Sequence, residues 1–425
     1  MKKISFLLIS ALFSVSYLSA KKNPVPYCYQ GHYSDTSSYI WCMLDESDSP
    51  NQVFTYVGSD AQEKEIKGTW NTYGKYTYGH LRIEGLQPNT PYSLQLNQKK
   101  ILDFKTRNPQ QDTVQLLVGS CAMKAFGPHW IFRPKVRYPI YDVMSAESND
   151  AMIWMGDNIY LLGREPYSDK KQIKKYLRTR RVPQLAHFMQ STPQYSMWDD
   201  HDFGPNNSDG SFILKDTSLK NFQHFWANPA PVDSTQGIYY SIRFPQAEIF
   251  MTDNRYHAVN GERYFSDEQM QWLLNSLKLS DATFKIIISG NQANNTLTRH
   301  ETLYSTGEFK KISDFISEEK VTGVVFVNGD RHHSEMLKHQ IDGLYPVYEF
   351  TNSSMTSIPS GIGKRNREFN NPARIHGVTS GHVFGKICIY PSETTGAWNI
   401  RLSTISKKGK LRWEEIISSD ELRWK

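Results

Sequence analysis

The sequence contains few cysteines, little net charge and, beyond its first 20 residues, no long apolar run. Only 4 of its 425 residues are cysteine, and 49 Lys and Arg nearly balance 43 Asp and Glu, for a net charge of +6. The densest basic stretch, residues 170–181, is typical of a solvated helix face, so we expect no specific nucleic-acid binding. Because a spanning helix needs about 20 predominantly apolar residues, we also expect no transmembrane segment.

The first 20 residues have the three regions of a secretory signal peptide. Two lysines follow Met1, residues 4–15 are largely apolar, and small residues stand at Ser19 and Ala20. This apolar stretch is short and interrupted by serines, which favours a cleaved signal peptide over a membrane span. We therefore expect cleavage after Ala20 and an exported protein, either periplasmic or extracellular.

Export would permit disulfide bonds. The four cysteines are Cys28, Cys42, Cys121 and Cys388. Cys28 and Cys42 are close together in the chain and form the favoured pair, although spacing alone leaves the other pairings open.

The remaining chain has two regions with different sequence patterns. Residues 23–106 contain short β-type runs separated by turn residues, which predicts a small all-β sandwich. Its segment 86–96, with Tyr92 after a Pro-Asn-Thr-Pro turn, resembles the corner of fibronectin type III-like modules, in which a Tyr hydroxyl ties the loop backbone. After a polar linker, apolar runs alternate with helical patterns, as in an α/β domain. We expect a signal peptide (1–20), a β-sandwich domain (21–108) and an α/β domain (109–425).

Each apolar run in the second region is followed by polar residues. The runs that begin near residues 114, 151, 192, 249, 286 and 324 end in Gly119-Ser120-Cys121, Gly156-Asp157-Asn158-Ile159-Tyr160, Asp199-Asp200-His201-Asp202, Asp253-Asn254-Arg255, Gly290-Asn291-Gln292 and Gly329-Asp330-Arg331-His332-His333. A single Asp after a strand is more often a helix cap or turn former than a ligand. In an open α/β sheet, however, the carboxyl ends of strands share one edge, so these groups can converge.

A cluster of carboxylates and imidazoles at one point is repulsive unless cations compensate it. The sequence therefore predicts bound metal ions. Carboxylate, imidazole, phenol and thiolate together suit a transition metal beside a harder cation such as calcium.

In this order and spacing, the motifs around Cys121, Asp157, Asp200, Arg255 and Asp330 resemble those of the alkaline phosphatase D (PhoD-like) family of metallophosphatases. The resemblance implies an α/β fold, a two-sheet αββα metallophosphoesterase-like sandwich preceded by the small β-sandwich. It also implies Fe3+ with Ca2+ nearby, other divalent ions being possible. The reaction would be hydrolysis of small phosphomonoesters, phosphodiesters or both by a metal-activated water, with phosphate as a product.

The resemblance also assigns roles to individual residues. Cys121 and Tyr160 would bind iron, Asp157 would bridge two metals and take part in catalysis, and Asp200 would serve the second metal. Asp330 and His332 would complete the two sites. Arg255 would bind the phosphate group, and His201 would lie near the leaving group.

Several positions stay ambiguous at this stage. Of the neighbours Asp199 and Asp200, one is expected to be a metal ligand and the other structural, and both remain candidates. His332 is preferred to His333 because it keeps a two-residue offset from Asp330. Asn291 is a candidate ligand for metal or phosphate. Two other functions also remain open, a phospholipase-like diesterase and a non-enzymatic surface-binding protein with a vestigial metal site.

Overall fold

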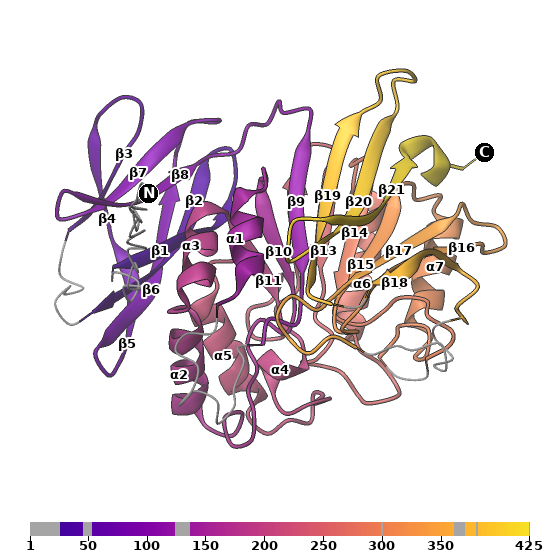
Figure 1. Ribbon diagram of the computed structural model, residues 1–425, viewed down its shortest axis with the longest axis horizontal. Helices are drawn as coiled ribbons and strands as arrows, with labels where there is room; N and C mark the ends of the chain where they lie inside the picture. The colour runs from indigo at the N-terminus through magenta and orange to yellow at the C-terminus, as the bar shows by residue number, and fades with distance from the viewer. Residues whose placement is uncertain are drawn as a thin grey trace, which may run out of the picture.

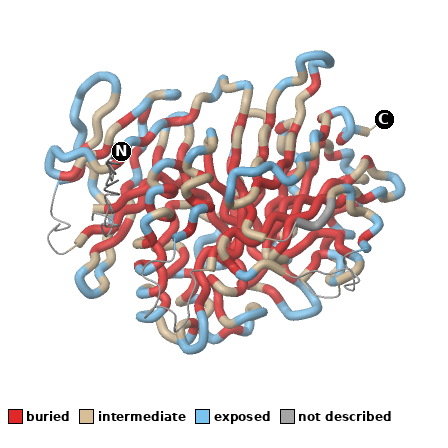
Figure 2. Tube along the Cα trace, viewed as in Figure 1, coloured by how far each residue is buried: buried red, intermediate tan, exposed pale blue. Residues whose placement is uncertain are grey.

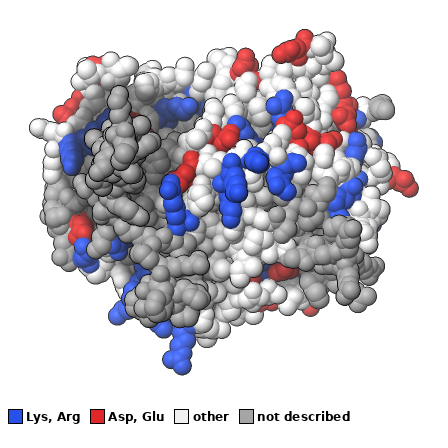
Figure 3. Space-filling view, in the orientation of Figure 1, with Lys and Arg blue, Asp and Glu red and all other residues white. Residues whose placement is uncertain are grey.

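The computed structural model describes residues 26–45, 53–123, 137–298, 301–360, 370–379 and 381–424. The expected signal peptide lies outside these residues. Within them, no helix combines the length and apolarity needed to cross a membrane. On the face seen in Figure 3, both basic and acidic side chains are present among the described residues.

Two four-stranded antiparallel sheets come first in the chain (Figure 1). Their strand orders are β1-β2-β6-β5 and β4-β3-β7-β8. The strands are β1 (Tyr27–Tyr33), β2 (Ser37–Asp45), β3 (Phe54–Val57), β4 (Glu63–Ile66), β5 (Gly68–Tyr73), β6 (Tyr76–Glu84), β7 (Pro91–Leu96) and β8 (Lys99–Lys105). Both sheets contribute to one buried apolar cluster that includes Phe54, Leu81 and Phe104, which confirms the predicted all-β sandwich.

Two local predictions about this sandwich are also confirmed. A disulfide joins Cys28 to Cys42, which face each other on the paired strands β1 and β2. The Tyr92 hydroxyl accepts a hydrogen bond from the backbone N–H of Gln87 at 2.9 Å, so it ties the loop that precedes β7.

Two larger sheets form the rest of the described chain. Their strand orders are β11-β10-β9-β19-β20-β21 and β12-β13-β14-β15-β17-β16-β18. The strands are β9 (Val114–Gly119), β10 (Ala151–Met155), β11 (Gln194–Met197), β12 (Tyr240–Phe244), β13 (Ala247–Met251), β14 (Phe284–Ser289), β15 (Val324–Asn328), β16 (Ser334–His339), β17 (Val347–Asn352), β18 (Arg374–Thr379), β19 (Val383–Pro391), β20 (Trp398–Ser406) and β21 (Leu411–Ser418). The central strands are mostly apolar because both of their faces are buried (Figure 2). The exception inside them is Lys285 of β14, whose ammonium group donates a hydrogen bond to the carbonyl of Ala282 at 2.8 Å.

The two larger sheets pack face to face and share one apolar core. Phe350 of β17 lies 5.5 Å, ring centre to ring centre, from Trp413 of β21. The helices are α1 (Pro139–Ala146), α2 (Asp169–Thr179), α3 (Pro183–Ser191), α4 (Asp200–Phe203), α5 (Lys215–Phe225), α6 (Asp267–Leu279) and α7 (Glu308–Glu318), with a short 3-10 helix at Ser419–Leu422. Helices α1, α3 and α5 lie between the N-terminal sheets and the six-stranded sheet, and α7 lies on the far side of the molecule (Figure 1). This arrangement confirms the predicted αββα sandwich.

The N-terminal sandwich packs directly against α5. The ring of Tyr78 on β6 stacks on Phe225 at 4.6 Å between ring centres, and the Trp41 indole donates a hydrogen bond to the carbonyl of His224 at 2.9 Å. These contacts bury one face of the sheet β1-β2-β6-β5.

Parallel pairing sets the place of the functional residues. Strands β9, β10 and β11 are parallel to one another, and so are β13, β14 and β15. The carboxyl ends of each trio therefore meet at one edge, and the polar motifs that follow these strands are brought together there.

Candidate functional site

Two groups of metal-ligand side chains meet at Asp157. One group is Cys121, Asp157 and His332, and the other is Asp157, Asp200 and His201. Within each group the candidate ligand atoms all lie within 4.8 Å of one another. Because Asp157 belongs to both groups, its carboxylate has the position of a ligand shared by two cations.

The backbone at this site adopts an unusual conformation. Cys121, Asp157, Asp330 and His332 have φ angles of 56°, 57°, 56° and 57°. Non-glycine residues seldom adopt this left-handed region, and such residues cluster where function requires them. Each turn follows a strand directly. The positive φ therefore turns the chain sharply after the strand, and this sets the direction of these side chains at the sheet edge.

Gly156, directly before Asp157, is required by its own positive φ and by a close contact with Asp199. Its φ is 88°, and a Cβ atom placed there would lie 2.5 Å from the Cβ of Asp199. A side chain at position 156 would thus separate the loop after β10 from the loop after β11. The Gly-Asp pair in the sequence is explained by this close approach.

Tyr160 and His332 belong to the same centre. The Tyr160 hydroxyl lies 3.4 Å from Nε2 of His332, and its ring stacks on His201 at 4.3 Å between ring centres. Nδ1 of His332 lies 2.6 Å from the carbonyl oxygen of Ile358. An N–H at Nδ1 that donates to this carbonyl leaves the lone pair on Nε2, the usual arrangement of a metal-binding histidine.

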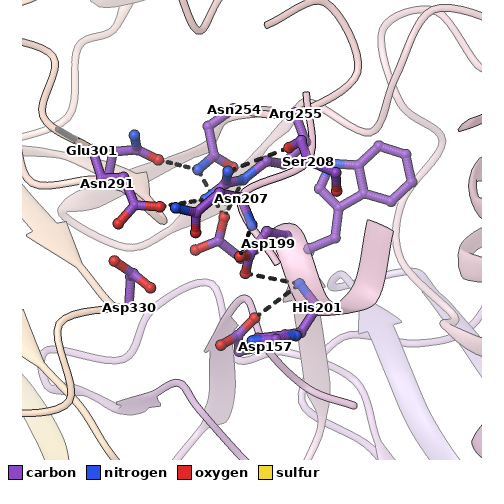
Figure 4. Close-up of polar contacts among 12 residues, drawn as sticks. Asp157, Asp199, His201, Asn207, Ser208, Asn254, Arg255, Asn291, Glu301 and Asp330 are labelled. Atoms are coloured by element: carbon purple, nitrogen blue, oxygen red, sulfur yellow. Dashed lines mark hydrogen bonds and ion pairs between the residues drawn. The ribbon is translucent and has the colours of Figure 1, made fainter. Parts of the chain in front are cut away.

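The structure separates Asp199 from Asp200. Asp200 lies in the second ligand group, and its Oδ2 accepts a hydrogen bond from the backbone of Asn207 at 2.6 Å. Asp199 instead caps α4, and its Oδ1 lies 2.5 Å from Nε of Arg255 (Figure 4). The other carboxylate oxygen of Asp199 is buried without a hydrogen-bond partner among the described residues. Asp199, an expected metal ligand, is thus placed against Arg255 and outside both ligand groups.

Arg255 and Asn291 lie beside Asp199. The Nη1 of Arg255 lies 3.4 Å from the carbonyl oxygen of Ser208. Asn254 donates hydrogen bonds from Nδ2 to Asp199 and to Asn291, and these contacts are drawn in Figure 4. Within the described part of the chain, Nδ2 of Asn291 is buried and has no hydrogen-bond partner. Arg255 and Asn291, two of the predicted phosphate-binding residues, are therefore linked through Asp199 and Asn254.

The electrostatics of these groups fit bound cations. Burial, together with the charges of Asp200 and Asp199, raises the pKa of Asp157 well above its usual range. Burial also raises the pKa of Asp330, with a further contribution from Glu301. The pKa of the Cys121 thiol is raised by burial and by the neighbouring carboxylates. Cations would remove this repulsion, so the donor set suits metal binding.

His333 faces away from the ligand groups. It is fully buried, and its Nε2 lies 3.2 Å from Oε1 of Glu335. Glu335 also forms an ion pair with Arg374 at 2.7 Å. The preference for His332 over its neighbour therefore agrees with where the two side chains lie.

Two further groups belong to this site: Asp253, which stood in a strand-end motif but was given no role, and Glu301, which the sequence analysis did not single out. Asp253 accepts hydrogen bonds from the Trp198 indole and from the backbone N–H of Arg255, both at 2.9 Å, and so holds the arginine loop. Glu301 reaches Arg255 from a segment that follows no strand, so no pattern singled it out. A shallow, widely open cavity of about 390 Å³ lies at the predicted metal ligands Asp330 and His332 and is also lined by Arg331, Ile358, Pro359 and Ser360.

Comparison with known proteins identifies a family and similar folds for this chain. The model of a family described as PhoD-like phosphatase matches residues 116–383. A solved structure of PhoD is similar with a TM-score of 0.67 and 17% identity, over 93% of this chain and 90% of that chain. Purple acid phosphatase PPD1 from yellow lupin (Lupinus luteus) seeds has a TM-score of 0.67 and 13% identity, over 92% and 74%. No curated protein sequence matches. At these identities, the structural similarity establishes the fold.

Proposed function

The chain belongs to the PhoD-like phosphatase family, and from this we propose that it is an exported, metal-dependent hydrolase of small phosphate mono- or diesters. The observation that carries the proposal is the pair of ligand groups that share Asp157. Two ligand groups with a common carboxylate are the arrangement used by two-metal phosphoesterases.

We assign the first cation to Cys121, Asp157, His332 and Tyr160, and propose Fe3+ because thiolate and phenolate are ligands for a transition metal. Asp157 and Asp200 would hold the second cation, for which we propose Ca2+. The carboxylate of Asp330, an expected ligand, belongs to neither ligand group, although its charge acts on Asp157 and on Cys121. When bound, such cations lower the pKa of a water molecule and neutralise charge on the phosphate oxygens.

The protein's own groups would position the ester. Asp199 holds Nε of Arg255, which orients the guanidinium toward phosphate oxygens. Asn291 offers an amide N–H group as a further donor. Both side chains are buried, so hydrogen bonds to a phosphate group would be formed in a site with little competing water.

His201 has two candidate roles. We propose that it protonates the departing alkoxide, as a histidine near the leaving group can. Burial lowers its pKa, whereas the charge of Asp200 raises it, so His201 would have to take up a proton before it could act as the acid. Its grouping with Asp157 and Asp200 supports metal binding as the second role. A ligating imidazole could not also deliver the proton, so the two roles can be separated by experiment.

A phospholipase-like diesterase is the second candidate function. It is favoured by Ile358, which lines the cavity beside His332 although its side chain is 73% exposed. Ile358 would give the apolar group of such an ester one apolar contact next to His332.

The deciding experiment measures metal content and turnover together. Metals in the purified protein would be quantified by mass spectrometry. Hydrolysis of p-nitrophenyl phosphate and of its bis-ester would be followed before and after chelation. We expect iron and calcium, with turnover lost on chelation and restored by the metals. A diester-only profile would replace the monoesterase by the second candidate. A protein that stays inactive after metal reconstitution would refute the phosphoesterase proposal.

A further inference from the structure

Glu301 lies between two arginines of the site. Its Oε1 is 3.6 Å from Nη2 of Arg255, and its Oε2 is 4.0 Å from Nη1 of Arg331. The residue has a φ angle of 57°, and its backbone N–H donates to the Tyr264 hydroxyl at 3.0 Å. Glu301 is thus held in an unusual backbone conformation that turns one carboxylate toward both guanidinium groups.

The two arginines have different surroundings. The Arg255 side chain is 5% exposed and has Asp199 as a close partner. Arg331 is 16% exposed and lines the cavity together with its neighbours Asp330 and His332. Arg331 is therefore the arginine that borders the cavity beside Asp330 and His332, while Arg255 is buried against Asp199.

We propose that Arg255 and Arg331 form a two-arginine phosphate clamp, and that Glu301 occupies this clamp as a competing carboxylate when no phosphate is bound. The inference rests on the proposed function and identifies a specificity residue for it. Two oxygens of a carboxylate bridge two guanidinium groups in the way that two phosphate oxygens can.

The long distances of its ion pairs agree with a Glu301 carboxylate that phosphate can displace. Separations of 3.6 and 4.0 Å exceed the 2.7–2.9 Å typical of a charge-assisted hydrogen bond. Glu301 is also 21% exposed, in contrast to Asp199 at 1%. Asp199 is therefore the permanent partner of Arg255, whereas Glu301 can move into solvent at small cost.

Binding of inorganic phosphate to the metal-loaded protein tests the clamp without requiring turnover. Isothermal titration calorimetry would compare the wild type with Glu301→Gln and Arg331→Gln. Removing the competing charge should tighten phosphate binding by about threefold or more, and removing the cavity arginine should weaken it by about tenfold. Glu318→Gln is the matched control, because Glu318 is exposed at the end of α7, away from the strand ends that form the site. It should leave the dissociation constant unchanged.

Each result has a defined meaning. If Glu301→Gln binds phosphate no more tightly than the wild type, Glu301 does not compete with phosphate. If Arg331→Gln binds phosphate as tightly as the wild type, Arg331 is not part of a phosphate clamp. Should Glu301→Gln fold poorly in a thermal melt, Glu301→Asp replaces it. Asp tolerates the left-handed backbone and is too short to bridge both arginines, so phosphate binding should again tighten. A wild type that binds phosphate through Arg331 but hydrolyses no ester would refute the proposed function and leave the clamp in place.

Discussion

Asp157→Asn should stabilise the metal-free protein while abolishing its metal-dependent activity. Asp157 is fully buried and, without cations, is opposed by the charges of Asp200, Asp199, Asp202 and Asp330, which raise its pKa. Asn has the shape of a neutral carboxyl group and tolerates the positive φ at this position. The substitution therefore removes the electrostatic cost and introduces no backbone strain.

The size of the effect follows from proton linkage. An Asp with a raised pKa destabilises the fold because the unfolded chain ionises more readily, and the cost grows as the pH rises above the usual value of 3.8. Each pH unit contributes at most about 1.4 kcal/mol, so the ceiling at pH 7 is about 4 kcal/mol. Relaxation around a buried group reduces this ceiling, and we expect a gain of about 2 kcal/mol in the free energy of unfolding.

The assay is unfolding of chelator-treated protein in urea at pH 7 and again at pH 4. The gain should be present at pH 7 and small at pH 4, because pH 4 lies close to the usual pKa of 3.8 and the cost of keeping the carboxyl group protonated in the fold has barely begun to grow. Asp342→Asn, at an exposed turn, is the control and should change neither value. With metals added, the wild type should be more stable to urea than Asp157→Asn, because only the wild type binds both cations. A metal-free Asp157→Asn protein that is less stable than wild type, or a variant that keeps full metal content, would refute the reasoning.

Three further predictions concern the ligands, the leaving group and pH. Cys121→Ser should lose iron, measured by mass spectrometry, because a hydroxyl replaces a thiolate, whereas Cys388→Ser should retain it; equal iron in both variants would contradict the assignment. His201→Gln should lose about 10²-fold in rate with glycerol phosphate and much less with p-nitrophenyl phosphate if His201 is the proton donor; equal losses accompanied by lost metal would show a ligand. Burial lowers the pKa of His32 and of His80 to about 4, so their contribution to stability is present above pH 6.5 and is lost as the pH falls toward 4, by up to about 3 kcal/mol each. His80→Gln should therefore flatten the fall in urea midpoint between pH 7 and pH 5, and an unchanged slope would count against the burial argument.

The fold class was predictable because its signals are local. Short, mostly apolar runs are what strands buried on both faces require. β10 is wholly apolar, β14 is apolar apart from Lys285 and Ser289, and β15 is apolar up to Asn328. The start of α6 is marked by a local signal of the same kind, since the Ser266 side chain accepts a hydrogen bond from the N–H of Gln269, three residues later.

Much of the candidate site was also visible in the sequence. Cys121, Asp157 and His332 each stand in the first turn after a strand, and parallel pairing brings such turns to one edge. Strand order and chain direction alone therefore bring these residues to the same edge of the sheets, whatever contacts their side chains make.

Side-chain partners depend on contacts between distant segments, and these were decided by the tertiary structure alone. Asp199 and Asp200 are adjacent and chemically identical, yet only packing against Arg255 separates the arginine partner from the member of the ligand group. Glu301 follows no strand and joins the site by reaching Arg255 and Arg331 across the fold. The sequence by itself determined which chemical groups arrive at the sheet edge, because strand periodicity is local. The tertiary structure decided which of them meet, because ion pairs and ligand groups depend on distances in space.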